Sequence, residues 1–186
     1  MKRLIDITLT IMILVWVSVP MILVALLIKL TSTGPILYWS DRVGRNNELF
    51  KMPKFRTMCT DTPPVATHLL VDPNRYLTPI GAFLRKSSLD ELPQLYSIAK
   101  GDMSFVGPRP ALFNQEDLIA LRTARGIHML TPGLTGWAQI SGRDELPIPL
   151  KVDFDEYYLL HHSPLLDFKI IVLTALKVLR REGVQH

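Results

Sequence analysis

Two adjacent acidic residues, Asp90 and Glu91, follow the basic pair Arg85 and Lys86 at the predicted start of a helix. A helix start has unpaired N–H groups and a partial positive charge, which stabilise an ionised carboxylate and attract phosphate. An acid in that setting is a candidate nucleophile, although acids in a first turn are also common as simple helix caps. Because neighbouring residues on a helix point about 100° apart, Asp90 and Glu91 need separate roles.

Basic side chains on rigid turns are the second feature of the sequence. A Gly-Pro-Arg-Pro turn carries Arg109, and a later Gly-Arg pair carries Arg143. Proline limits the freedom of such a turn, and a guanidinium matches two phosphate oxygens at once. Each turn alone is better explained as a solvated surface charge. Together with Lys54 and Arg56, they predict a site for an anion.

Several other chemistries lack their sequence patterns. His128, His161 and His162 do not have the spacing of zinc ligands, and adjacent histidines on a helix diverge. The single cysteine, Cys59, excludes an internal disulfide framework and a multi-cysteine zinc site. The sequence has no glycine-rich loop of the nucleotide-hydrolase or dinucleotide type and no nucleophile elbow. Nucleotide hydrolysis, dinucleotide binding and the α/β-hydrolase reaction are therefore disfavoured.

The elements that must position these groups are mostly helices. Ser88 and Glu91, at the spacing of a capping box, predict a helix that starts near Asp90. Turn residues around a short apolar run predict a β-hairpin within residues 36–52. Residues 165–181 have the pattern of an amphipathic interfacial helix, or equally of a core helix with a solvated basic face. The expected fold class is therefore α+β, mostly helical, with one small globular domain.

An uncharged stretch over residues 7–28 is long enough to cross a bilayer. Basic residues flank both of its ends, so both ends satisfy the rule that places Lys and Arg on the cytoplasmic side. Pro20 removes a backbone donor, and the Ser18 hydroxyl is the nearest candidate to bond the carbonyls left free. We therefore predict a re-entrant, helix-break-helix membrane anchor over residues 1–30, followed by a cytosolic domain at the membrane surface over 31–186.

Two alternatives apply to this stretch. A spanning helix with a proline kink explains the segment equally well when its flanks are ignored. A cleaved signal peptide has an apolar region of about 7–15 residues and ends in a small-residue cleavage site. This stretch is too long for that and has no such site. The charge on both flanks favours re-entry.

The overall charge points to an anionic partner. The 186 residues carry a formal net charge of +4, which suits lipid headgroups, a phosphorylated substrate or nucleic acid. A nucleic-acid binder needs a basic helix or stacking aromatic residues on an exposed face. Because the aromatic residues here mostly lie in apolar patterns, nucleic acid is the least favoured of the three.

Four motifs in this order resemble those of the monotopic phosphoglycosyl transferases, a family of bacterial sugar transferases. The motifs are KFRTM from Lys54, SSLDELPQL from Ser87, GDMSFVGPRP from Gly101 and PGLTGWAQ from Pro132. The resemblance extends from the membrane segment to about Lys177, nearly the whole chain. It is similar to the minimal catalytic form, without the extra spanning helices or fused domains of larger relatives.

The resemblance implies a reaction. Such enzymes transfer a sugar 1-phosphate from a UDP-sugar to undecaprenyl or another polyprenol phosphate, at the cytoplasmic face of the bacterial inner membrane, opening glycoconjugate synthesis. By this likeness Asp90 attacks the β-phosphate, releases UMP and holds the phosphosugar until the lipid phosphate displaces it. Glu91 matches the family's second acid, a proton acceptor or positioning group. Mg²⁺, with Asp90 as its expected ligand, offsets the charge of the diphosphate.

The remaining site residues follow the same likeness. Arg109 and Arg143 match positions that clamp phosphate. Lys54, Arg56 and Arg85 lie in the neighbouring motifs and are expected to bind substrate as well.

The membrane break departs from the family at one position. Many relatives have Ser directly before Pro, whereas Val19 separates Ser18 from Pro20 here. This separation weakens the expected role of the hydroxyl, but not the break itself.

One alternative function belongs to another class. A basic module at the membrane surface could hold anionic lipid or recruit a partner without chemistry. Replacement of Asp90 by Asn separates the two, because only the transferase depends on that carboxylate.

Overall fold

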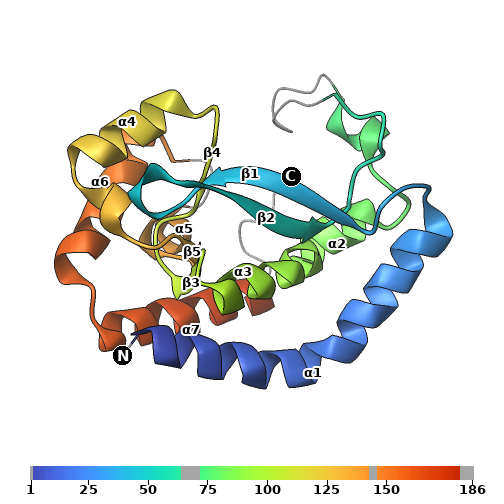
Figure 1. The fold of residues 1–186 in the computed structure, drawn as a ribbon, viewed down its shortest axis with the longest axis horizontal. Coiled ribbons are helices and arrows are strands. Elements are labelled where there is room, and N and C mark those ends of the chain that lie inside the picture. The colour runs from blue at the N-terminus through green and yellow to red at the C-terminus, as the bar shows by residue number, and fades with distance from the viewer. Residues whose placement is uncertain (1, 64–71, 143–145, 181–186) are drawn as a thin grey trace.

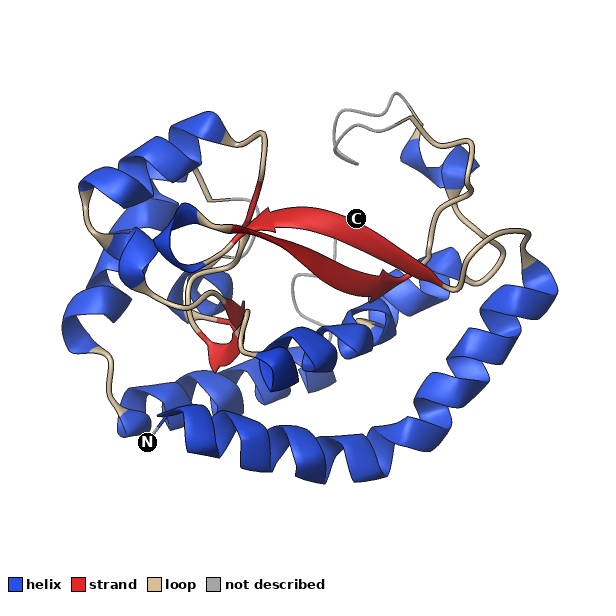
Figure 2. Cartoon of the chain, viewed as in Figure 1, coloured by secondary structure: helices blue, strands red, loops and turns tan. Residues whose placement is uncertain are grey.

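The computed structural model describes residues 2–63, 72–142 and 146–180, which form a mostly helical α+β structure (Figures 1 and 2). The predicted fold class is confirmed at this level. In chain order the elements are α1 (Lys2–Thr31), β1 (Leu37–Val43), η1 (Arg45–Asn47), β2 (Leu49–Phe55), η3 (Pro73–Tyr76), α2 (Gly81–Ser87), η4 (Leu89–Gln94), α3 (Leu95–Lys100), β3 (Ser104–Val106), β4 (Ala111–Leu112), α4 (Glu116–Ala124), η5 (Ile127–Met129), β5 (Gly133–Thr135), α5 (Trp137–Ser141), α6 (Ile148–His161) and α7 (Pro164–Arg180).

The predicted β-hairpin is present and longer than its apolar run. Strands β1 and β2 pair antiparallel, with Leu37 opposite Phe55 at the open end. Asn46 and Asn47, between the strands, have φ angles of 56° and 62°, a left-handed conformation that asparagine tolerates better than most residues. Strand β4 extends this sheet, and β3 pairs with β5 in a separate parallel pair.

Helix α1 bends around one side of the domain (Figure 1). Its first half packs on a core cluster that includes Ile98 and Phe105, and its second half on a cluster that includes Phe55 and Leu84. The helical residues that make these contacts are Leu9, Ile13, Leu14 and Val17 in the first half, and Met21, Val24, Ala25 and Ile28 in the second. The change of partner coincides with Pro20, which bends a helix by removing a hydrogen bond.

The break expected in this segment is corrected in two respects. The helix continues through Pro20 from Lys2 to Thr31, so the structure shows one bent helix instead of two helices with a gap. The Ser18 hydroxyl donates to the Val15 carbonyl at 3.2 Å. This is not the Trp16 carbonyl, which is the group that loses its helical partner at Pro20.

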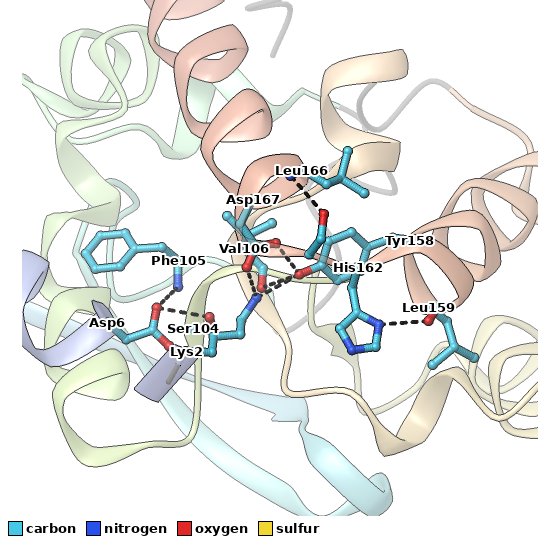
Figure 3. Close-up of polar contacts among 11 residues, drawn as sticks. Lys2, Asp6, Ser104, Phe105, Val106, Tyr158, Leu159, His162, Leu166 and Asp167 are labelled. Atoms are coloured by element: carbon cyan, nitrogen blue, oxygen red, sulfur yellow. Dashed lines mark hydrogen bonds and ion pairs between the residues drawn. The ribbon is translucent and has the colours of Figure 1, made fainter. Parts of the chain in front are cut away.

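Polar contacts hold the N-terminal end of α1 on the domain (Figure 3). Lys2 Nζ donates to the Tyr158 hydroxyl and to Asp167 Oδ2, both at 2.7 Å. The buried Asp6 carboxylate accepts from the Ser104 hydroxyl at 3.1 Å and from the next backbone N–H at 3.2 Å. Lys2 and Asp6 therefore fix the beginning of α1 to α6, α7 and β3.

The segment that directly follows the C-terminal end of α1 is held by Arg56, the residue after β2. Its Nε donates to the Pro35 carbonyl at 2.6 Å, and its Nη2 donates to the Ser32 hydroxyl at 2.9 Å and the Ser32 carbonyl at 3.2 Å. Both ends of α1 are thus bonded to the same domain.

Helices α1 and α7 each have an apolar outer face. In α7, Ile170 is fully buried, while Leu165 and Phe168 are 78% and 64% exposed. The predicted helix over 165–181 therefore both packs in the core and exposes apolar side chains. Among the described residues, α1 is the one helix long and apolar enough to cross a membrane. Its most exposed apolar residues are Leu4, Val15, Trp16, Val19 and Leu30.

Candidate active site

Asp90 and Glu91 lie in the first turn of η4, which packs against β2. Ser88, just before it, adopts a left-handed conformation (φ 56°, ψ 17°) and makes no side-chain cap. The predicted capping box is therefore wrong, because the Ser88 carbonyl instead accepts from the Glu91 N–H at 3.2 Å. Pro93 lies inside this 3-10 turn, and the α-helix begins only at Leu95. Asp90 itself is buried, with 8% of its surface exposed.

The Glu91 carboxylate pairs with two cations. Lys54 Nζ, on β2, lies 2.8 Å from Glu91 Oε1, and Arg109 Nη2 lies 3.3 Å from the same oxygen. Burial raises the pKa of Glu91, but the charges and hydrogen bonds of Lys54 and Arg109 outweigh it and hold that pKa well below its usual range. Glu91 is therefore ionised at neutral pH. Its two ion pairs connect the motifs that begin at Lys54, Ser87 and Gly101.

Arg85 and Asp90 face a common region. Burial lowers the pKa of Arg85, and the negative charge of Asp90 raises it in partial compensation. The Arg85 Nε donates to the Thr57 hydroxyl at 3.0 Å, which directs the guanidinium back toward the first motif. Asp90 therefore interacts electrostatically with the Arg85 guanidinium.

The turn that carries Arg109 is held by the fourth motif. The Gly107 N–H donates to the Thr135 carbonyl and the Gly133 N–H to the Pro108 carbonyl, each at 2.9 Å. A side chain at Gly133 would place its Cβ 2.1 Å from the Gly107 nitrogen. Glycine is required here because two backbones meet at contact distance.

One predicted substrate residue, Arg56, lies elsewhere in the structure. The structure does not bring Arg56 to Glu91, because its guanidinium is bonded to the end of α1. Arg143 lies outside the described residues. Phosphate binding by Arg56 and Arg143 stays a prediction.

The structure contains no preformed metal cage in the part of the chain it describes. Within residues 2–63, 72–142 and 146–180, no group of three or more His, Cys, Asp or Glu side chains could hold an ion. His161 and His162 are exposed and contact backbone carbonyls of their own helix.

Two residues with structural influence on the site were missed from the sequence. Asp6 is the one acid in helix α1 and directly precedes the uncharged stretch, and a charge in a mostly apolar helix is a signal that could have revealed it. Arg122 donates to the Arg109 carbonyl and to Asp155, 13 and 33 positions away. Such distant partners leave no local pattern in the sequence.

Comparison with known proteins identifies the family of this chain. The family model described as bacterial sugar transferase matches residues 1–181. The chain belongs to this family. The resemblance inferred from the four motifs is confirmed, and with it the prediction that the chain is an enzyme of the phosphoglycosyl transferase type.

Three relatives show the range of the family. The chain is 42% identical to an uncharacterized sugar transferase, EpsL, of Bacillus subtilis, covering 100% of this chain and 91% of that protein. It is 37% identical to the exopolysaccharide production protein ExoY of Sinorhizobium fredii, over 98% of this chain and 87% of that protein. It is 39% identical to the undecaprenyl-phosphate galactose phosphotransferase of Salmonella typhimurium, over 98% of this chain but 41% of that protein. The chain thus spans less than half the length of the relative with a named reaction.

Proposed function

We propose that this chain transfers a sugar 1-phosphate from a UDP-sugar to a polyprenol phosphate of the undecaprenyl type, as the first membrane step of glycoconjugate synthesis. The observation that carries the proposal is the pairing of Lys54 and Arg109 with Glu91, next to the buried Asp90. A cluster of cations of this kind suits a diphosphate. Relatives named for phosphotransfer to undecaprenyl phosphate support the acceptor.

The reaction has two phosphoryl transfers. A carboxylate oxygen of Asp90 attacks the β-phosphorus of the UDP-sugar, and the bond from this phosphorus to the bridging oxygen breaks. UMP leaves with that electron pair, and the sugar phosphate remains on Asp90 as a mixed anhydride. A phosphate oxygen of the polyprenol phosphate then attacks the same phosphorus and displaces the carboxylate. The product is a polyprenyl diphosphate sugar, and Asp90 is regenerated.

The cations and Glu91 prepare the site for this reaction. Lys54, Arg85 and Arg109 bind the phosphate oxygens, and a guanidinium can make two parallel contacts where lysine makes one. A carboxylate whose pKa is held low by two cations is a weak base. We therefore assign Glu91 to positioning Lys54 and Arg109, and not to accepting a proton.

Mg²⁺ fits this site in combination with the substrate. Mg²⁺ usually keeps several waters and is held by one or two carboxylates together with substrate phosphates, so it needs no cage made by the protein alone. The Asp90 carboxylate, buried beside the diphosphate site, suits that mode. When bound, the ion offsets the negative charge that would repel the approaching carboxylate.

We further propose that α1 enters and leaves the membrane on the cytoplasmic side. Lys2 bonds to Tyr158 and Asp167 at one end of α1, and Arg56 bonds to Ser32 just beyond the other. Because both ends are bonded to one domain, a helix crossing the bilayer would have to break one set of contacts. The exposed apolar faces of α1 and α7 then lie in lipid, with basic residues near anionic headgroups.

An assay of UMP release tests the proposed reaction. The purified full chain is incubated with Mg²⁺, a short polyprenol phosphate and each member of a panel of UDP-sugars. We expect UMP from at least one donor, and mass spectrometry without acceptor should find the phosphosugar on Asp90. Asp90→Asn should abolish both signals. Asp153→Asn, which alters an exposed ion pair with Arg125, is the matched control and should keep them.

Two results would contradict the proposal. Release of no UMP from any donor by a folded protein would favour a module that binds anionic lipid without chemistry. An adduct on another side chain would remove Asp90 as the nucleophile.

A further inference from the structure

Arg122 is a buried arginine whose side chain contacts the backbone of the turn that carries Arg109. It lies on α4 and is 7% exposed. Its Nε and Nη2 donate to Asp155 Oδ2 at 3.0 and 2.6 Å, and its Nη1 donates to the Arg109 carbonyl at 2.8 Å. Asp155, on α6, thus binds one edge of the guanidinium, and the remaining nitrogen binds the backbone of the turn.

The Arg109 carbonyl, which accepts from Arg122, lies between two other carbonyls that are also hydrogen-bonded. Arg109 stands between two prolines, which restrict the backbone on both sides of it. The Pro108 carbonyl accepts from the Gly133 N–H at 2.9 Å, and the Pro110 carbonyl accepts from Arg42 Nη1 at 3.2 Å. The contact from Arg122 binds the carbonyl between these two, in the residue whose side chain extends to Glu91.

Stability alone is a poor explanation for this buried pair. Burial raises the pKa of Asp155, and the charge and hydrogen bonds of Arg122 offset only part of this rise. Buried ion pairs are often replaceable by apolar residues without loss of stability, but they can fix one geometry among several. Here the geometry is that of the contact from Arg122 to the turn that carries Arg109.

We propose that Arg122 is a positioning residue for the transfer reaction, acting through the Arg109 carbonyl to place the Arg109 guanidinium for substrate phosphate. Asp155 orients Arg122 for this task. This inference rests on the proposed function, in which Arg109 binds the diphosphate.

A double-mutant cycle with Arg109 tests the inference. Arg122→Lys keeps a charge beside Asp155 but is too short and has too few nitrogens to hold the carbonyl as well. We expect it to lower kcat/KM for UMP release about tenfold, because small displacements of a phosphate-binding group are costly. In an Arg109→Lys background the same change should cost less than about twofold, since its target is already altered. Arg125→Lys, at the exposed α4–α6 ion pair with Asp153 and Glu156, is the matched control and should change neither background.

The outcomes separate positioning from a structural role. An equal loss in both backgrounds, or no loss in either, would overturn the inference. If Arg122→Lys does not fold, Asp155→Asn takes its place, since its remaining oxygen can still accept from Arg122. That variant should lower kcat/KM by less than about threefold in the wild-type background and by a smaller factor in the Arg109→Lys background. For this variant too, an equal loss in both backgrounds, or no loss in either, would overturn the inference.

Binding of UDP provides a readout that does not require turnover. The same cycle, measured as UDP affinity by calorimetry, should show the same non-additivity. If the wild type released no UMP yet showed this pattern, the proposed reaction would fail and the positioning role would stand. Additive effects on affinity would overturn the positioning role whether or not turnover is seen.

Discussion

The Asp6 carboxylate, on the apolar helix α1, accepts a hydrogen bond from the Ser104 hydroxyl at 3.1 Å, across 98 positions of the chain (Figure 3). Ser104 begins β3, and the turn that carries Arg109 directly follows this strand. The helix assigned to the membrane and the loop assigned to the phosphates are therefore linked by a buried carboxylate.

Asp6→Ala should destabilise the protein markedly. It leaves the Ser104 hydroxyl and the Phe105 N–H buried without their acceptor, which costs about 2 kcal/mol of unfolding free energy. Asp6→Asn retains an acceptor oxygen and should cost less than about 1 kcal/mol. Urea unfolding in detergent micelles measures both. Equal stability of Asp6→Ala and wild type would show that this contact does not fix α1.

The contribution of Glu91 to the free energy of unfolding should decrease as the solution is acidified. Its folded-state pKa lies below the unfolded value of about 4.3, so the unfolded state binds more protons as the pH falls. The stability difference between wild type and Glu91→Gln should therefore be constant above about pH 5 and shrink below about pH 4. Chemical denaturation across this range measures it. A difference that grows on acidification would have the wrong sign.

Glu91 should also leave no acidic limb in the rate profile between about pH 5 and 8, because it stays ionised there. Wild type and Glu91→Gln would then differ in kcat by a constant factor. A limb that disappears in Glu91→Gln would instead identify Glu91 as the proton acceptor.

Arg56→Gln should affect stability more than substrate binding. Its guanidinium holds Ser32 and Pro35 at the end of α1, so we expect a loss of about 2 kcal/mol in unfolding free energy. The KM for the UDP-sugar should stay within about twofold, whereas Lys54→Gln should raise it about tenfold. Steady-state kinetics at a temperature where both variants are folded decide between these roles. A large rise in KM for Arg56→Gln would restore the original prediction for this residue.

Pro20→Ala should alter the topology of α1. Restoring the hydrogen bond to Trp16 straightens the helix, so its two halves can no longer both reach their core clusters. An N-terminal tag should then become accessible to protease from the outside of intact spheroplasts in part of the population. Ser18→Ala is the control, because its hydroxyl bonds only to Val15 among the contacts found. A tag that stays protected in Pro20→Ala would show that the bend does not set the topology.

Local patterns and motifs determined much of this protein. The long apolar segment, the hairpin and the amphipathic helix at residues 164–180 follow from periodicity and turn residues, which act over a few positions. The four motifs indicated the family, and family comparison confirmed it. Lys54 and Glu91 were also identified as site residues, and the structure brings them together.

Tertiary structure decided which cations face the acids and where each helix begins. Lys54 and Arg56 are two positions apart in the sequence. Lys54, on β2, contacts Glu91, whereas Arg56 contacts Ser32 just beyond α1. Ser88 adopts a left-handed conformation where the sequence predicted a cap. The contacts of Asp6 with Ser104 and of Arg122 with Arg109 join residues whose separation leaves no local signal. Sequence patterns record the energetics of neighbouring residues, whereas these contacts exist only after distant segments have packed and excluded water.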